Sequence, residues 1–129
     1  GALKPVTGVY DHLGGPGDAG LVARFIGEEL GYGRDNVNIH KGWFQDTLPV
    51  TETGEIAILR LDGDWYASTK VCLEYLYDKV VPGGFIIFDD YGTYDGCRKA
   101  VDEFLSAREP NSVFLNFISV DGRYMIKQG

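Results

Sequence analysis

Two stretches decide the fold: IAILRLDGDWY at residues 56–66 and FIIFDDYG at residues 85–92. In each, an apolar run typical of a buried strand ends in acidic residues, and a helical pattern follows. Loops at the carboxyl ends of strands in an open α/β sheet are where ligands bind, so carboxylates from two such loops can converge on one point. Carboxylates gathered in one pocket repel one another unless a cation neutralises them. The pattern therefore predicts a cation site at one edge of a parallel sheet.

Helices and strands alternate along most of the remaining chain. Periodicity and turn residues predict a helix over 21–30 capped by Asp18, a strand over 37–40, a helical turn over 44–48, a strand over 56–61 buried on both faces, a helix over 65–80 stopped by Pro82-Gly83-Gly84, a strand over 85–88, a helix over 94–108, and strands over 113–118 and 123–126 around the hairpin signal Asp121-Gly122. Residues 1–20 show no periodicity and are expected to be a flexible arm or a lid. The order predicts an α/β fold with parallel strands and a terminal antiparallel hairpin.

Composition limits the kinds of partner. The chain has 129 residues, the length of one domain, and its 19 acidic against 12 basic residues give a net charge of −7. This charge argues against nucleic acid or an anionic membrane as the main partner. Cys72 and Cys97 fall inside predicted helices, as expected of reduced, buried thiols. With no apolar run near the roughly 20 residues of a membrane span, we expect a soluble, cytoplasmic protein.

Four motifs in order resemble one family, the macrocin O-methyltransferases. They are KGWFQDTLP at 41–49, LRLDGDWYAST at 59–69, PGGFIIFDDYG at 82–92 and CRKAV at 97–101, and the resemblance spans roughly residues 35–108. It implies a Rossmann-like, class I methyltransferase fold. It also implies transfer of a methyl group from S-adenosylmethionine, with a divalent metal that is usually Mg²⁺, to a sugar hydroxyl of a natural product. The acceptor partner would be a small molecule.

The resemblance also implies roles for the acids. Asp62, Asp89 and Asp90 fall on the positions that hold the metal, and Asp64 falls on the general base. Elementary chemistry agrees, because a hard cation held by oxygen ligands lowers the pKa of a hydroxyl that a carboxylate can then deprotonate. The alternative for any one of these acids is a simple helix cap.

Weaker predictions concern the cofactor and the acceptor. The resemblance implies that the loop at Gly42 passes along the adenine, with Phe44 as an apolar contact and Gln45 as a polar one. The alternative is a hydrophobic helix entry with Gln45 in solvent. Tyr66 and Tyr91 lie beside the acids and are candidate substrate contacts, although such tyrosines more often pack with a hydrated hydroxyl.

A complete family member would carry two further strands before the first residue of this chain, the first followed by a glycine-rich turn for the cofactor. We therefore expect residues 21–129 to be the carboxyl-terminal part of a Rossmann-like domain whose first two strands are absent. In the family's sheet they would lie between the strands at 37–40 and 56–61. Unpaired strand edges invite association, so a homodimer or a smaller, rearranged sheet is expected. The alternative function is a non-catalytic metal-binding or assembly module derived from such an enzyme.

Overall fold

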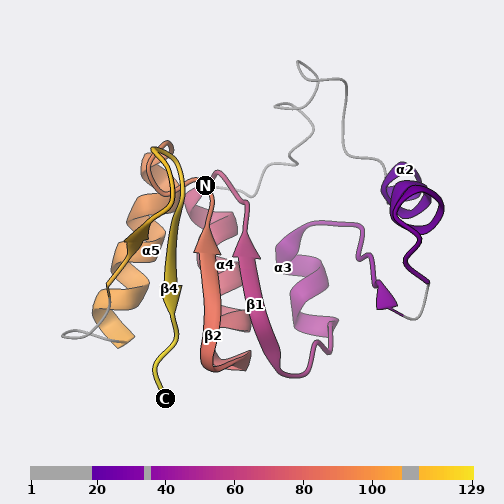
Figure 1. Ribbon diagram of the computed structural model, residues 1–129. Helices are drawn as coiled ribbons and strands as arrows, with labels where there is room; N and C mark the ends of the chain where they lie inside the picture. Colours follow the sequence, from indigo (N-terminus) through magenta and orange to yellow (C-terminus); the bar gives the residue numbers. More distant parts are fainter. Residues whose placement is uncertain (1–18, 34–35, 109–113) are drawn as a thin grey trace. The chain divides into compact units, whose positions relative to one another are not determined.

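Strand β2 (Val80–Phe88) lies between β1 (Ile56–Leu61) and β4 (Arg123–Ile126), and the short β3 (Asn116–Phe117) forms the far edge of the sheet (Figure 1). β1 and β2 run parallel, whereas β4 is antiparallel to both β2 and β3. This computed structural model describes residues 19–33, 36–108 and 114–129. The predicted α/β fold, parallel first and antiparallel last, is confirmed.

Two helices cover one face of the sheet. α4 (Tyr66–Leu76) connects β1 to β2, and α5 (Asp95–Arg108) follows β2; the two helices contact each other and lie on the same side of the strands (Figure 1). Fully buried side chains fill the space between helices and sheet: Leu73, Val80, Ile86, Phe88, Cys97 and Val101. A short helix α3 (Phe44–Thr47) and a 3-10 turn (Leu48–Val50) precede β1. The buried side chains of α5 are those of Cys97, Ala100, Val101 and Leu105.

The segment around Pro82-Gly83-Gly84 differs from its prediction. α4 ends at Leu76, a 3-10 turn covers Tyr77–Lys79, and β2 already begins at Val80, so the proline and glycines lie inside the strand and do not stop the helix. The backbone N–H of Gly83 donates to the Lys127 carbonyl at 2.8 Å, and the N–H of Lys127 donates to the Gly84 carbonyl at 2.9 Å. These bonds satisfy the backbone at an irregularity where Gly83 has a φ of +83°.

The opposite face of the sheet is exposed. In β1, Leu59 and Leu61 are buried, but Ile58 is 63% exposed, so the prediction that both faces are buried is wrong. Ile58 pairs with Phe85, and Phe85 pairs with Ile126, which makes a continuous exposed apolar row. The cause is that both long helices of this unit pack on the other face. Among the residues described, β1 pairs with β2 alone, and the homodimer stays a prediction.

Residues 4–43 form a second unit, separate from the unit that begins at Phe44. In it, α2 (Ala19–Arg24) runs into a π-helical turn (Phe25–Glu29), and Gly31 follows with a φ of +74°, as a helix end requires. The predicted helix is confirmed, but residues 37–40 form no strand, so that prediction is wrong. A strand needs a neighbour to take its backbone hydrogen bonds, and this segment has none within the described part of its unit.

Two sequence predictions fall outside this description. Asp18 and the predicted arm lie beyond the described residues, apart from residues 19–20, which begin α2. In the parts of the chain that the structure covers, no helix combines the length and apolar character of a membrane span.

Both cysteines are free and buried, as predicted. Burial raises the pKa of the Cys72 thiol to about 12 and that of Cys97 to about 11. Both thiols are therefore protonated near neutral pH, and they belong to the core.

Replacing Leu73 by alanine tests this core. Because Leu73 is completely buried between α4 and the sheet, Leu73→Ala should lower the free energy of unfolding by about 2–5 kcal/mol in urea denaturation. Val50 is 82% exposed, so the control Val50→Ala should change it by less than about 0.5 kcal/mol. Equal effects of the two substitutions would contradict the packing described here.

Candidate functional site

The two acidic loops start at the same level of the sheet. Leu61 pairs with Phe88 at the ends of β1 and β2, and the backbone N–H of Asp89 donates to the Leu61 carbonyl at 3.0 Å. Asp62 therefore leaves one strand where Asp89 leaves the other. The predicted meeting of the two loops at one edge of a parallel sheet is what the backbone pairing produces.

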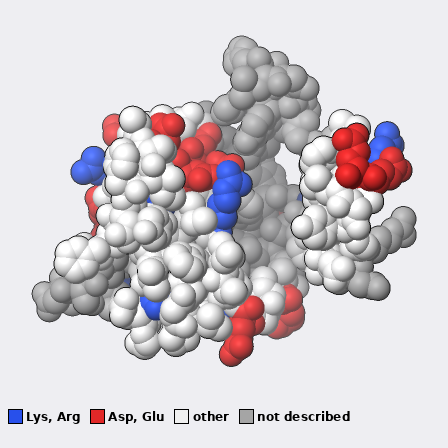
Figure 2. All heavy atoms as spheres, viewed as in Figure 1, with Lys and Arg blue, Asp and Glu red and all other residues white. Residues whose placement is uncertain are grey.

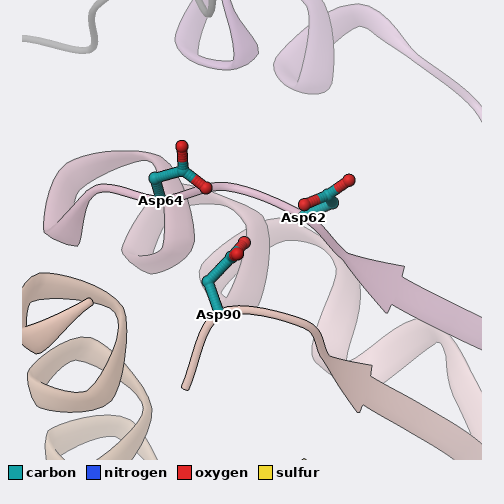
Figure 3. Close-up of side chains that lie close together, drawn as sticks. All are labelled: Asp62, Asp64 and Asp90. Atoms are coloured by element: carbon teal, nitrogen blue, oxygen red, sulfur yellow. The ribbon is translucent and has the colours of Figure 1, made fainter. Parts of the chain in front are cut away.

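Three of the four predicted acids form a cluster. Asp62, Asp64 and Asp90 each bring one carboxylate oxygen to within 4.8 Å of the others, and Figure 3 shows the three side chains pointing toward one another. Oδ2 of Asp90 is buried and has no hydrogen-bond partner. In Figure 2 acidic side chains gather over the carboxyl ends of β1 and β2, with a basic side chain against them. We call these three residues the acidic cluster.

The electrostatics of the acidic cluster fit a hard cation. Burial, followed by the charges of Asp64 and Asp62, raises the pKa of Asp90 to about 7. Without a cation, this carboxyl group is therefore only partly ionised near neutral pH. Carboxylate oxygens from two loops, one of them buried and unpartnered, are the donor set that Mg²⁺, Mn²⁺ or Ca²⁺ prefers.

The fourth acid, Asp89, lies outside the acidic cluster. Its carboxylate is paired with the guanidinium of Arg60, which stands on β1 two residues before Asp62. Nη2 of Arg60 also lies 3.5 Å from Oδ2 of Asp62. The structure thus brings together Asp62, Asp64 and Asp90, while Arg60 holds Asp89 at the side.

Hydrogen bonding and close packing around Gly63 fix the conformation of the first acidic loop. Gly63 is buried, its carbonyl accepts a bond of 2.9 Å from Oγ1 of Thr69, and a Cβ there would come within 3.1 Å of Oγ of Ser68. The N-cap of α4 is Trp65, and no side-chain capping bond is made there. Capping therefore does not explain the position of Asp64.

The second loop is held by hydrogen bonds within itself and to the β3–β4 turn. The N–H groups of Thr93 and Tyr94 both donate to the Asp90 carbonyl, and the N–H of Gly92 donates to the Asp121 carbonyl at 2.8 Å. A Cβ on Gly92 would lie 1.8 Å from the Val120 carbonyl oxygen, so only glycine permits this approach.

The turn at residues 118–122 forms the second wall of a cleft of about 500 Å³. The side chain of Thr93 donates to the carboxylate of Asp121 across this wall. Lining residues come from both acidic loops and from the turn: Arg60, Asp62, Asp89, Asp90, Thr93, Tyr94, Ile118, Ser119, Asp121 and Gly122. Sequence reasoning missed the turn as part of the site. The signal was present, because a last strand antiparallel to β2 must place its preceding turn beside the end of β2.

The two candidate substrate tyrosines are engaged elsewhere. The hydroxyl of Tyr66 donates to Oε2 of Glu103 at 2.6 Å, and that of Tyr91 donates to Oδ1 of Asp102 at 2.7 Å. Both acceptors lie on α5. These contacts agree with the alternative of packing residues with a polar hydroxyl, and the substrate role of both tyrosines stays a prediction.

The candidate cofactor residues lie at and before the start of α3. Phe44 is half-buried against the core, and Gln45 next to it is exposed. Gly42 belongs to the other unit and has a φ of +138°. Neither Phe44 nor Gln45 lines the cleft, so the cofactor roles of these residues stay predictions.

Comparison with known sequences gives a consistent result. Residues 24–126 match the family described as Macrocin-O-methyltransferase (TylF). An 8-demethyl-8-(2,3-dimethoxy-alpha-L-rhamnosyl)-tetracenomycin-C 4'-O-methyltransferase from Streptomyces olivaceus is 49% identical over 77 residues, which are 60% of this chain and 29% of that protein. A mycinamicin III 3''-O-methyltransferase from Micromonospora griseorubida is 38% identical over 87 residues, 67% of this chain and 33% of the relative. The chain thus spans about a third of the length of these relatives.

Solved structures show the same fold. The O-methyltransferase NovP superimposes with a TM-score of 0.64 and 38% identity, over 74% of this chain and 42% of that one. The TDP-rhamnose 3'-O-methyltransferase CalS11 of calicheamicin biosynthesis superimposes with a TM-score of 0.56 at 21% identity, over 67% of this chain and 40% of that one. The second likeness concerns the fold alone.

The raised pKa of Asp90 predicts how stability depends on pH. The folded state binds this proton up to about pH 7, whereas the unfolded chain releases it near pH 4, so in this window the folded state loses stability as pH rises. Asp90→Asn removes the effect. In the presence of a chelator, the melting temperature of Asp90→Asn should exceed that of the parent chain. This excess should be larger at about pH 8 than at about pH 5.

Glu52→Gln is the control, because Glu52 is an exposed acid outside the cleft. Its melting temperature should differ from that of the parent chain by the same small amount at both pH values. A melting difference for Asp90→Asn that does not change with pH would contradict the electrostatics described here.

Proposed function

Because this chain belongs to the macrocin O-methyltransferase family, we propose that its acidic cluster serves divalent-metal-assisted transfer of a methyl group to a hydroxyl of a sugar or natural product. The single observation that carries the proposal is the convergence of Asp62, Asp64 and Asp90 from two neighbouring strand ends. An acidic cluster without a cation would leave the buried Oδ2 of Asp90 uncompensated.

The residues take different parts in this proposal. Asp62 and Asp90 are metal ligands, Asp89 joins them when it leaves Arg60, and Asp64 is the general base. When bound, a divalent cation would supply the positive charge that lowers the pKa of the acceptor hydroxyl. Asp64 would take the hydroxyl proton while the oxygen forms its bond to the methyl carbon and the bond from that carbon to the donor sulfur breaks, the sulfur leaving with the electron pair. A half-buried carboxylate on a loop held by Gly63 is suited to this, because it keeps its position beside Asp62 and Asp90.

We infer S-adenosylmethionine as the methyl donor from family membership. Phe44 and Gln45 offer one apolar and one polar contact for its adenine, and Gly42 lies in the loop before them. These residues do not by themselves form a cofactor cavity, so no step of the chemistry is derived from their positions.

The proposed acceptor binds in the cleft. Its walls carry the hydroxyl groups of Thr93, Tyr94 and Ser119 beside the carboxylate of Asp121, together with the apolar Ile118. Hydroxyl groups and a carboxylate next to an apolar side chain suit a sugar ring, whose hydroxyl edges need hydrogen bonds and whose faces need apolar contact. The named relatives act on sugar-bearing natural products, in agreement with this assignment.

Metal titration separates the roles of the four acids. By calorimetry with MgCl₂, Asp62→Asn, Asp89→Asn and Asp90→Asn should each weaken binding by more than about tenfold, since loss of a ligand exceeds the usual loss of an outer partner. Asp64→Asn should keep most of the affinity. It should lower methyl transfer from S-adenosylmethionine to a rhamnosylated tetracenomycin by about 10²–10⁴-fold, as expected for a general base.

Two results would change the proposal. If Asp64→Asn lost the metal while Asp89→Asn kept it, the roles of base and third ligand would be exchanged. If the chain bound Mg²⁺ but transferred no methyl group under any condition, the acidic cluster would be that of a metal-binding module. Failure of the unsubstituted chain to bind any divalent cation would refute both functions.

A further inference from the structure

Arg60 is the basic residue among those that line the cleft. Its side chain extends from β1 on the face away from the helices, forms an ion pair with Asp89 and lies 3.5 Å from Oδ2 of Asp62. One guanidinium therefore contacts carboxylates from both acidic loops. All three residues line the cleft, and the Arg60 side chain is 60% exposed.

This arrangement explains why Asp89 is separated from the other acids. Four carboxylates at two adjacent strand ends would repel one another strongly. Arg60 draws one of them aside, and the remaining three form the acidic cluster. In the chain without a cation, the guanidinium thus supplies part of the positive charge that the site requires.

We propose that Arg60 is a built-in counter-ion that competes with the divalent cation for Asp89 and Asp62, and so sets the affinity of the metal site. The inference rests on the proposed metal-binding function and adds a residue that controls it. Loading the site requires the guanidinium to give up Asp89 and to swing into solvent. Arg60 is thus a positioning residue: it acts on the reaction through Asp89.

Competition outweighs any preorganising effect for two reasons. First, an exposed arginine is not held by packing, and exposed ion pairs add little to the stability of a fold, so releasing it is easy. Second, a guanidinium in contact with two of the ligand carboxylates repels a divalent cation that approaches them. For charges several ångströms apart near a protein surface, this repulsion corresponds to roughly tenfold or more in Kd.

The test is titration of the whole chain with MnCl₂, followed by calorimetry and by the paramagnetic resonance signal of free Mn²⁺. Arg60→Met keeps the length of the side chain without its charge and should tighten binding by about tenfold. Arg60→Lys keeps the charge and should stay within about threefold of the parent chain. Arg98→Met is the matched control: it removes an exposed arginine from α5 that pairs with Asp102 and does not line the cleft.

Two further arms identify the cause of the effect. The gain in Arg60→Met should shrink between about 0.05 M and about 0.5 M salt, because exposed charges are screened. In an Asp89→Asn background the same substitution should gain less than about threefold, because the carboxylate for which the two cations compete is gone. Thermal melting of each variant verifies the fold, and Arg60→Gln serves as the replacement if Arg60→Met melts early.

The outcomes are distinguishable. If the parent chain binds Mn²⁺ and Arg60→Met binds it equally or more weakly, the competition is refuted while the metal site stands. An undiminished gain in the Asp89→Asn background, or an equal gain in Arg98→Met, would also refute it, because the effect would then be one of overall charge. If neither the parent chain nor Arg60→Met binds Mn²⁺, both the inference and the proposed function fail.

Discussion

The parallel pairing of β1 with β2 is the constraint on which the site depends. Its last bond, from the N–H of Asp89 to the carbonyl of Leu61, brings the two strands to an end side by side. Each acid of the two loops, Asp62, Asp64, Asp89 and Asp90, lies within three residues of that bond. A shift of one strand by a single residue would turn every side chain of that strand to the opposite face and would also separate Asp62 from Asp90. The buried row of Leu59, Leu61, Ile86 and Phe88 prevents such a shift. Core packing and site geometry therefore depend on the same strand register.

Much of this arrangement could be predicted from the sequence. Apolar runs ending in DGD and DDY, each followed by a helical period, are enough to place acids from both loops at one sheet edge. The hairpin signal at Asp121-Gly122 likewise predicted the antiparallel finish. These predictions succeeded because they depend on local residue pattern and on the geometry common to parallel sheets.

The remaining features depend on contacts that a linear pattern does not contain. The sequence Pro82-Gly83-Gly84 predicts the end of a helix, but backbone hydrogen bonds with Lys127 make this segment part of β2. Val37 and Ile39 alternate like a strand, yet no strand pairs with them within the part of the chain that the structure describes. The sequence gives Asp89 and Asp90 the same predicted role, but Asp89 pairs with Arg60 whereas Asp90 lies in the acidic cluster.

The route of the chain through the cleft has a consequence for its assembly during synthesis. Both acidic loops leave the ribosome well before β4, yet the wall opposite them is built from the turn that β4 anchors beside Gly92. A nascent chain therefore has its acidic loops in place before the opposite wall of the cleft, which is completed only when Met125 has emerged and its strand has docked. Arg60 is already translated at that stage, so its guanidinium is available to neutralise Asp89 before the cleft is complete.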